Sequence, residues 1–450
     1  MNHTLHTLLR LRWMLAVVAA WTFSEATAQS ASLTLEQAQQ QALQNAMSVK
    51  NSRYDAQIAE LNTRELLGVG LPQMSGSLEY QNFLNLPTSV VPGEFFGAPG
   101  QLVKLRFGVP HQMTAGISAS QLLFNGSWLV GLQASRAYAD LQSKQIAKSE
   151  QELKKQVADA YHTAITVSET MKQLQKSRDV LNNTLQQTKA LYQEGFAEEQ
   201  DAEQLQLTLN GLDVQINYLM QQSRLAKDVL KVIIGTPLST DLELTDTVEG
   251  LMAQSGQDLL NVPFNVENTT DYQVLNGALG MQQLNVRAKK AELLPTLAGF
   301  YNLQTQGLRN EFNYFDTKQP WFPIQLWGVT LSVPILSGGS KVANIKKAEV
   351  EVMRYTDMLS TTKNSLELEY RSALADFDYA LNNLKQQQAN VTLASSILEK
   401  TNIKFNEGVA TSFEISQYTS QLLNAQSSYI QAMQQALAAR TRLAKSLNQL

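Results

Sequence analysis

Apolar residues recur at alternating steps of three and four through two long stretches of the chain. Nine of eleven such positions are apolar or aromatic in residues 157–192, and again in residues 370–405. Each pattern resumes after a short break, over residues 205–230 and 418–443. Because a heptad seam of this kind is typical of coiled-coil packing, the pattern predicts pairs of long helices.

The placement of proline agrees with this prediction. All 11 prolines fall within residues 72–110, 237–263 and 295–334. Proline breaks helix interiors, so the tracts between and after these zones are free to form long helices. The segment 128–194 alone corresponds to a helix of roughly 100 Å at about 1.5 Å per residue. Such a helix spans a distance rather than building a compact core.

The two helical tracts are related by a constant offset of 213 residues. The break itself repeats, since Tyr192-Gln193-Glu194-Gly195 corresponds to Phe405-Asn406-Glu407-Gly408. A glycine is common where a helix ends, so each tract is expected to fold back on itself at this glycine. We therefore predict an internal duplication. The predicted first repeat is 29–245, with helices at about 127–234, and the second is 246–450, with helices at about 340–448.

Ahead of each helical tract, apolar residues alternate with small polar residues. Ala115, Ile117 and Ala119 share one face of the first such segment, and Trp327, Val329, Leu331 and Val333 share one face of the second. The predicted strands are about 73–86, 112–124, 296–306 and 325–336. Strands of this length suit a tilted membrane span, although a soluble sheet shows the same alternation.

Aromatic residues favour the membrane interpretation of these strands. Eight aromatic residues lie between 296 and 336, and aromatic girdles are typical of outer-membrane barrels. Four strands cannot close a membrane barrel, for which about eight is the lower limit. Since an open sheet edge is not tolerated in lipid, several chains must share one barrel if the strands span a bilayer.

The N-terminus has the pattern of a secretory signal peptide, residues 1–28. Arg10 and Arg12 precede the apolar run Trp13–Phe23, and Ala26-Thr27-Ala28 is a small-x-small cleavage site. The chain has no cysteine and a net charge of −4, which argues against a disulfide scaffold and a nucleic-acid binder. These features indicate a bacterial envelope protein.

Local motifs occur in the same order in both halves of the chain. They are Leu35-Glu36-Gln37-Ala38, the pair Leu71-Pro72 and Leu294-Pro295, the strand exits Gln121-Leu122-Leu123-Phe124-Asn125-Gly126 and Val333-Pro334-Ile335-Leu336-Ser337-Gly338, and the turns Tyr192-x-x-Gly195 and Phe405-x-x-Gly408. With the signal peptide and the duplication, the chain resembles the outer-membrane efflux proteins, the TolC family.

The resemblance implies a mainly α fold with a membrane β-barrel. It implies a homotrimer with a 12-stranded barrel in outer-membrane lipid and a 12-helix coiled-coil tunnel in the periplasm. The protein would be a passive exit duct of a tripartite efflux or type I secretion system. Its partners would be a periplasmic adaptor (membrane fusion) protein and an inner-membrane efflux pump or ABC exporter. The family is not enzymatic and has no catalytic residue, cofactor or metal.

The resemblance also implies a lumen constriction near the second turn. Glu414 matches an acidic residue that narrows the inner end of the duct, and Asp201 holds the matching position of the first repeat. The next lumen position is Gln417, where relatives usually have an acidic residue. The arginine and tyrosine of the usual latch are replaced by Ala410 and Phe405. The alternative is that Glu414 is a solvated residue near a helix start.

Both turns carry small and apolar residues at an expected exposed end. These are Gly195, Phe196 and Ala197 in the first turn and Gly408, Val409 and Ala410 in the second. We expect them to form the periplasmic tips and a docking surface for an adaptor's helical hairpin. Simple helix capping by glycine is the alternative.

A second class of function stays open on the sequence alone. A periplasmic coiled-coil adaptor or structural spacer would explain the heptads and the signal peptide. It would leave the aromatic strand pairs and the whole-chain duplication unexplained. An enzyme has less support, because Ser337-Gly338-Gly339-Ser340-Lys341 lacks the spacing of a phosphate-binding loop and of a nucleophile elbow.

Overall fold

A computed structural model describes residues 31–97, 99–253 and 259–450. The predicted signal peptide, residues 1–28, lies outside the described residues. The described chain divides into two compact units. We call residues up to 53, 145–273 and 361–450 the helical unit, and residues 54–144 and 274–360 the strand unit. Each unit takes segments from both predicted repeats, and the repeat boundary at 245/246 stays a prediction.

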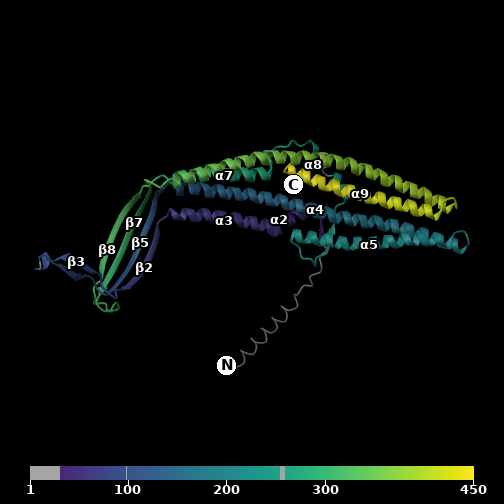
Figure 1. The fold of residues 1–450 in the computed structure, drawn as a ribbon. Coiled ribbons are helices and arrows are strands. Elements are labelled where there is room, and N and C mark those ends of the chain that lie inside the picture. The colour runs from purple at the N-terminus through teal and green to yellow at the C-terminus, as the bar shows by residue number, and fades with distance from the viewer. Residues whose placement is uncertain (1–30, 98, 254–258) are drawn as a thin grey trace, which may run out of the picture. The chain divides into compact units, whose positions relative to one another are not determined.

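Two pairs of long helices are present, as the heptad pattern predicts (Figure 1). The first pair is α4 (Gly126–Gln193) and α5 (Glu199–Ile234), and the second is α8 (Ser340–Asn406) and α9 (Ser412–Ser446). The shorter helices are α2 (Leu35–Asn45), α3 (Met47–Val69), α6 (Val248–Ala253) and α7 (Thr270–Ala291), with short 3-10 turns at Gly93–Phe96, Leu259–Asn261 and Val266–Asn268. None of the described helices has the length and apolar character that crossing a membrane requires.

The predicted seam residues are the ones that the helix pairs bury. Leu181 and Leu185 of α4 pack against Leu205 and Leu209 of α5, with each of these side chains at most 5% exposed. In the second pair, Ala394 and Leu398 pack against Leu422 in the same way. Burial of this seam is therefore what keeps the two members of each pair side by side.

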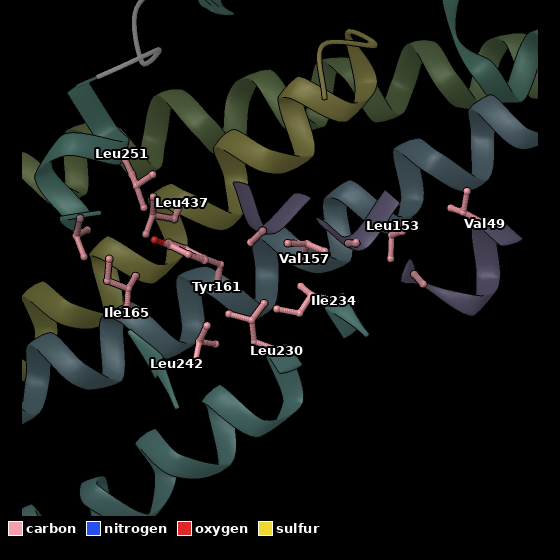
Figure 2. Close-up of a cluster of buried hydrophobic side chains, with 14 of the residues drawn as sticks. Val49, Leu153, Val157, Tyr161, Ile165, Leu230, Ile234, Leu242, Leu251 and Leu437 are labelled. Carbon is pink, nitrogen blue, oxygen red and sulfur yellow. The ribbon is translucent and has the colours of Figure 1, made fainter. Parts of the chain in front are cut away.

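The largest buried cluster lies where α4, α5 and α9 of the helical unit meet α2 (Figure 2). Tyr161 of α4 is fully buried among these helices. Its hydroxyl lies 3.0 Å from the carbonyl oxygen of Leu33 and 2.9 Å from the carboxylate of Asp246. Leu33 ends strand β1 (Ala31–Leu33), which pairs in parallel with β6 (Leu242–Leu244). The tyrosine thus joins the start of the described chain to the junction between the repeats.

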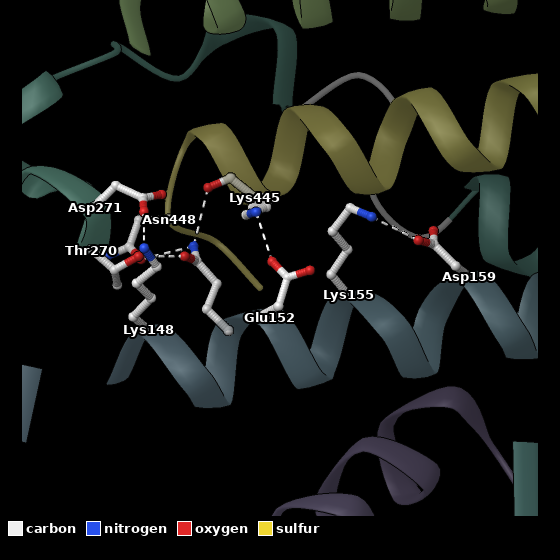
Figure 3. A network of polar contacts seen from close by, with 9 residues as sticks. Lys148, Glu152, Lys155, Asp159, Thr270, Asp271, Lys445 and Asn448 are labelled. Atoms are coloured by element: carbon white, nitrogen blue, oxygen red, sulfur yellow. Dashed lines mark hydrogen bonds and ion pairs between the residues drawn. The ribbon is translucent and has the colours of Figure 1, made fainter. Parts of the chain in front are cut away.

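A polar layer holds the end of α9 against α4 (Figure 3). The Lys445 ammonium lies 2.7 Å from the Glu152 carboxylate, and this bond lowers the pKa of Glu152. The Gln151 amide donates to the Asn448 side chain and accepts from the Thr270 hydroxyl at the start of α7. These contacts connect three helices that are far apart in sequence.

The strand unit contains a four-stranded antiparallel sheet in the order β2-β5-β7-β8 (Figure 1). The strands are β2 (Gln73–Asn82), β5 (His111–Asn125), β7 (Thr296–Arg309) and β8 (Phe322–Ser332). The central pair β5 and β7 comes from different predicted repeats and is paired from His111 with Arg309 to Asn125 with Thr296, with a bulge between Leu122 and Phe124. The two predicted hairpins are therefore fused into one sheet.

The strand bounds differ from those expected in three strands, and β7 extends to Arg309 rather than to about 306. β2 ends at Asn82 rather than near 86, and β8 spans 322–332 rather than 325–336. Pro334 has no N–H to donate, so the strand stops before it, whereas Pro323 is tolerated because β8 is an edge strand. The sequence also gave no sign of the hairpin formed by β3 (Thr88–Pro92) and β4 (Leu102–Arg106).

We predict that Tyr161→Phe destabilises the helical unit by about 1–3 kcal/mol, because it leaves buried polar groups without their hydroxyl partner. Thermal unfolding of the full protein in detergent, followed by circular dichroism, measures this as a lower Tm. Tyr379→Phe is the control, because that ring is 68% exposed. Equal Tm values for the two variants would contradict the role assigned to the Tyr161 hydroxyl.

Candidate functional site

The two helix reversals have the same backbone geometry. Gly195 and Gly408 both have positive φ, 82° and 74°. After each glycine, the next N–H bonds back into the preceding helix, from Phe196 to Leu191 and from Val409 to Lys404, both at 2.8 Å. Side chains disfavour this left-handed conformation, so glycine is required at both positions.

Each reversal leads into a helix whose start is capped reciprocally. In α9, the Thr411 N–H donates to the Glu414 carboxylate at 2.8 Å, while the Glu414 N–H donates to the Thr411 hydroxyl at 3.3 Å. In α5, Glu198 and Asp201 make the same box. Glu414 and Asp201, the two carboxylates predicted at the constriction, therefore each cap a helix. Capping explains why an acidic residue stands at each helix start, and it is compatible with a position in the lumen.

One hydrogen bond joins the two reversals. The Ser412 hydroxyl, at the start of α9, donates to the Asp201 carboxylate at the start of α5. Further along the same two helices, the hydroxyls of Thr208 and Ser416 lie 3.1 Å apart. Ser412 is 2% exposed, so the bond is shielded from water. The structure thus ties together helix starts from the two repeats.

A hollow of about 650 Å³ lies between the two reversals in the helical unit. It brings together most of the predicted site residues: Gly195, Phe196, Ala197, Asp201, Gly408 and Ala410. Val409, Glu414 and Gln417 do not line it. Phe196 and Val409 are 81% and 74% exposed, so this end presents apolar side chains to solvent.

Two site residues were missed by the sequence analysis. Ser412 supplies the bond to Asp201, and Phe413 adds a third apolar side chain at this end, 66% exposed. Phe413 stands five residues after Gly408, outside the three-residue turn that was considered. The sequence signal for Phe413 is the run of apolar residues that follows Gly408. This run continues past the turn to the start of α9, where Phe413 lies.

The sheet has one apolar face and one polar face. The register aligns Met74, Ala119, Tyr301 and Trp327 across the four strands on one face. On the other face it aligns Ser77, Gly116, Gln304 and Ile324. β7 and β8 depart from the pattern, because Phe300, Ile324 and Leu326 lie on the mainly polar face. Two-faced strands of this kind can separate lipid from an aqueous interior.

An aromatic cluster stands where β7 leaves the sheet. Tyr80 is hydrogen-bonded to His111 at 2.8 Å, and the Phe312 ring meets Tyr80 edge-on with centroids 5.4 Å apart. The Arg309 guanidinium lies over the rings of Tyr314 and Trp321, at 5.7 and 5.9 Å from their centroids. Part of the predicted aromatic enrichment is thus gathered into one cluster by the loop between β7 and β8.

Comparisons with known proteins agree with this architecture. The family model described as outer membrane efflux protein matches residues 276–449. Outer membrane protein TolC of Vibrio cholerae is 24% identical over 336 residues, covering 70% of this chain and 71% of the relative.

Solved channels share the fold of the chain. The CusC structure has a TM-score of 0.74 at 14% identity, with 95% of each chain covered. The open-state MtrE outer membrane channel of Neisseria gonorrhoeae has a TM-score of 0.72 at 15% identity, covering 92% of this chain and 88% of that one.

The two-faced sheet, the long helix pairs and these similarities define an outer-membrane efflux channel. The chain resembles the TolC family of outer-membrane efflux proteins, in its sequence motifs, in the family match over residues 276–449 and in the relative from Vibrio cholerae. Its location is accordingly the outer membrane. The adaptor or spacer alternative is not supported, because these relatives are themselves outer-membrane channels.

We predict that Gly408→Ala loosens the second reversal by about 1–2 kcal/mol, the usual cost of a left-handed conformation for a residue with a side chain. A Cβ at Gly408 would meet no atom within 4 Å, so backbone strain alone sets the cost. Hydrogen exchange of amides 405–412 should become faster.

Gly211→Ala, in the interior of α5, is the matched control. Its Cβ also meets nothing within 4 Å. Its φ is not positive, so alanine there should stabilise the helix by up to about 1 kcal/mol. Unchanged exchange around Gly408→Ala would contradict the strain argument.

Proposed function

We propose that the protein works as a trimeric exit duct that an inner-membrane pump or ABC exporter feeds through a periplasmic adaptor. The observation that carries the proposal is the two-faced sheet with two free edges. β2 and β8 each pair on one side only within the described chain. In lipid, unpaired backbone groups along these edges would carry a large free-energy cost.

Strand direction supports closure by copies of the same chain. The four strands alternate in direction, so β2 and β8 run antiparallel to each other. The β8 edge of one copy can therefore pair with the β2 edge of the next and continue an antiparallel sheet. One copy gives four strands, which is too few to close a membrane barrel. Two copies give eight strands, at the lower limit, and three copies give 12, well within the range.

A second apolar seam on α5 supports lateral contact between copies. Leu207, Val214, Tyr218, Leu225 and Val229 recur at steps of seven and four and are 47–70% exposed. They lie on a different face from Leu205 and Leu209, which pack within the chain. An apolar seam exposed to water is unfavourable, and a neighbouring helix would cover it. Three copies of four long helices would supply the 12 helices of a tunnel.

The reversals are the proposed contact for the adaptor and the proposed inner end of the duct. Phe196, Val409 and Phe413 are exposed apolar side chains that a helical hairpin could cover. Glu414 and Asp201 stand at adjacent helix starts, with Gln417 one turn beyond Glu414. Three copies of each carboxylate in a narrow opening would attract cations.

We predict that cysteines on the two edges cross-link neighbouring copies. The chain has no cysteine, so the background is zero. Ser77→Cys on β2 is combined in turn with Ile324→Cys, Leu326→Cys or Thr330→Cys on β8, all on the same face of the sheet. Within one chain these strands are three spacings apart, about 14 Å, which is too far for a disulfide.

The expected result is a covalent trimer on a non-reducing gel for at least one of the three pairs, with a trimeric mass in mild detergent. Leu78→Cys replaces Ser77→Cys in the control series, because the neighbouring residue points to the other face and should not cross-link. A monomer that conducts ions in planar bilayers, with no cross-link in any pair, would exclude the trimeric duct.

We predict that Glu414→Gln lowers the cation preference of the channel by up to about tenfold at low salt, because the ring of charge is lost. Glutamine also serves in a capping box, so stability should change by less than about 0.5 kcal/mol. Reversal potentials in planar bilayers measure the change. Glu407→Gln, at the exposed reversal, is the control, and equal selectivity in both variants and the wild type would place the constriction elsewhere.

We predict that Ala197→Glu with Ala410→Glu weakens binding of the periplasmic adaptor by about tenfold or more, or about 1.4 kcal/mol. Both glycines remain, so the reversals should fold normally. Gln187→Glu with Gln388→Glu adds the same charge at exposed positions of α4 and α8 and is the control. If the tip variant binds the adaptor as the wild type does, the docking role is wrong.

A further inference from the structure

A cavity of about 360 Å³ lies inside the helical unit, away from the reversals. Its walls include Leu35 and Gln39 of α2, His162 of α4, and Arg440 and Ala444 of α9. No part of the duct mechanism proposed above uses these residues. The cavity stands out because two side chains that line it have buried nitrogen atoms without a hydrogen-bond partner in the described part of the chain.

His162 is 5% exposed, and neither of its ring nitrogens has a hydrogen-bond partner among the described residues. Burial, together with the nearby charge of Arg440, lowers the pKa of His162 to about 4. The imidazole is therefore neutral near pH 7 and has one N–H to donate. A buried histidine in a packed protein normally has at least one partner.

Arg440 is a cation that forms no ion pair with any described residue. Its Nε is buried and unpartnered, and it makes no ion pair among the described residues. Burial lowers the pKa of Arg440, the opposite of what a nearby carboxylate would do, but the guanidinium stays charged. Neighbours on the same helix differ: Arg442 lies 3.0 Å from Asp376, and Lys445 lies 2.7 Å from Glu152.

The cavity wall offers no side-chain carboxylate to either group within the described chain. The main-chain oxygen of Leu450, which also lines the cavity, is already held by the Lys154 ammonium at 2.9 Å. Water can accept hydrogen bonds from Arg440 and His162, but it brings no negative charge to the partly buried guanidinium. A small anion with acceptor oxygens does both.

We propose that this cavity binds a small oxyanion, with Arg440 as the charge partner and His162 as a neutral hydrogen-bond donor. Phosphate and simple carboxylates share the required chemistry, since each presents a negative charge on oxygen atoms. The bound anion would complete the packing between α4 and α9 and so stabilise the helical unit. This site is separate from the reversals and does not depend on the proposed duct function.

The test uses the full protein in detergent and a chloride buffer free of oxyanions. Sodium phosphate, sodium acetate and sodium chloride are titrated at equal ionic strength, with Tm and calorimetric heat as readouts. Phosphate or acetate should raise Tm saturably, whereas chloride should not, and the stronger of the two identifies the oxyanion geometry. Because a ligand that binds the folded state raises its stability, absence of a saturable effect for both oxyanions overturns the proposal.

Variants assign the effect to the cavity. Arg440→Gln should weaken binding by about tenfold or more, and His162→Phe should weaken it to a smaller extent. Arg442→Gln removes a guanidinium two residues away and should leave binding unchanged. Equal weakening by Arg440→Gln and Arg442→Gln would show non-specific charge binding and overturn the proposal.

Arg440→Lys is the second variant, to be measured if Arg440→Gln does not fold. It keeps the charge but loses the planar set of donors, so weaker but measurable binding is expected. Wild-type affinity in both Arg440→Lys and His162→Phe would show that neither group contacts the anion.

Discussion

The packing of long helices along their heptad seams is the interaction on which the rest of this structure depends. A helix of 68 residues such as α4 has little stability without a neighbour, because helix propensity alone contributes only weakly. The neighbour of α4 is α5, and the buried leucines at 181, 185, 205 and 209 form the contact between the two helices. Such pairing requires a sharp reversal at the end, and the positive φ of Gly195 and Gly408 provides it.

The two predicted repeats are interleaved rather than placed one after the other. β5 of the first repeat pairs along its whole length with β7 of the second. In the helical unit, the Asp201–Ser412 bond and the contacts of Tyr161 with Leu33 and Asp246 also cross between repeats. Strands and helices of each predicted repeat therefore pack against elements of the other repeat. For this reason each of the two compact units contains segments of both repeats.

The described single chain leaves backbone groups at two strand edges unpaired and an apolar helix face exposed. The free edges of β2 and β8 need backbone partners, and the exposed seam on α5 needs an apolar one. Additional copies of the same chain can meet both needs, because the strands of the sheet alternate in direction and a helix of another copy can cover the apolar seam. The exposed apolar side chains at the reversals have a different character, since they stand at helix ends and suit a different protein.

The sequence by itself determined the elements that depend on local periodicity. Heptad spacing located the helix pairs, the repeated glycine located both reversals, and alternation located the four strands of the sheet. The tertiary structure alone decided which distant residues meet. In the tertiary structure, the Ser412 hydroxyl donates a hydrogen bond to Asp201. Strand β8 begins at Phe322, since an edge strand tolerates Pro323. His162 and Arg440 line one cavity. Periodicity states which face of an element is buried, but the partner across a helix interface is chosen by packing between segments that are hundreds of residues apart.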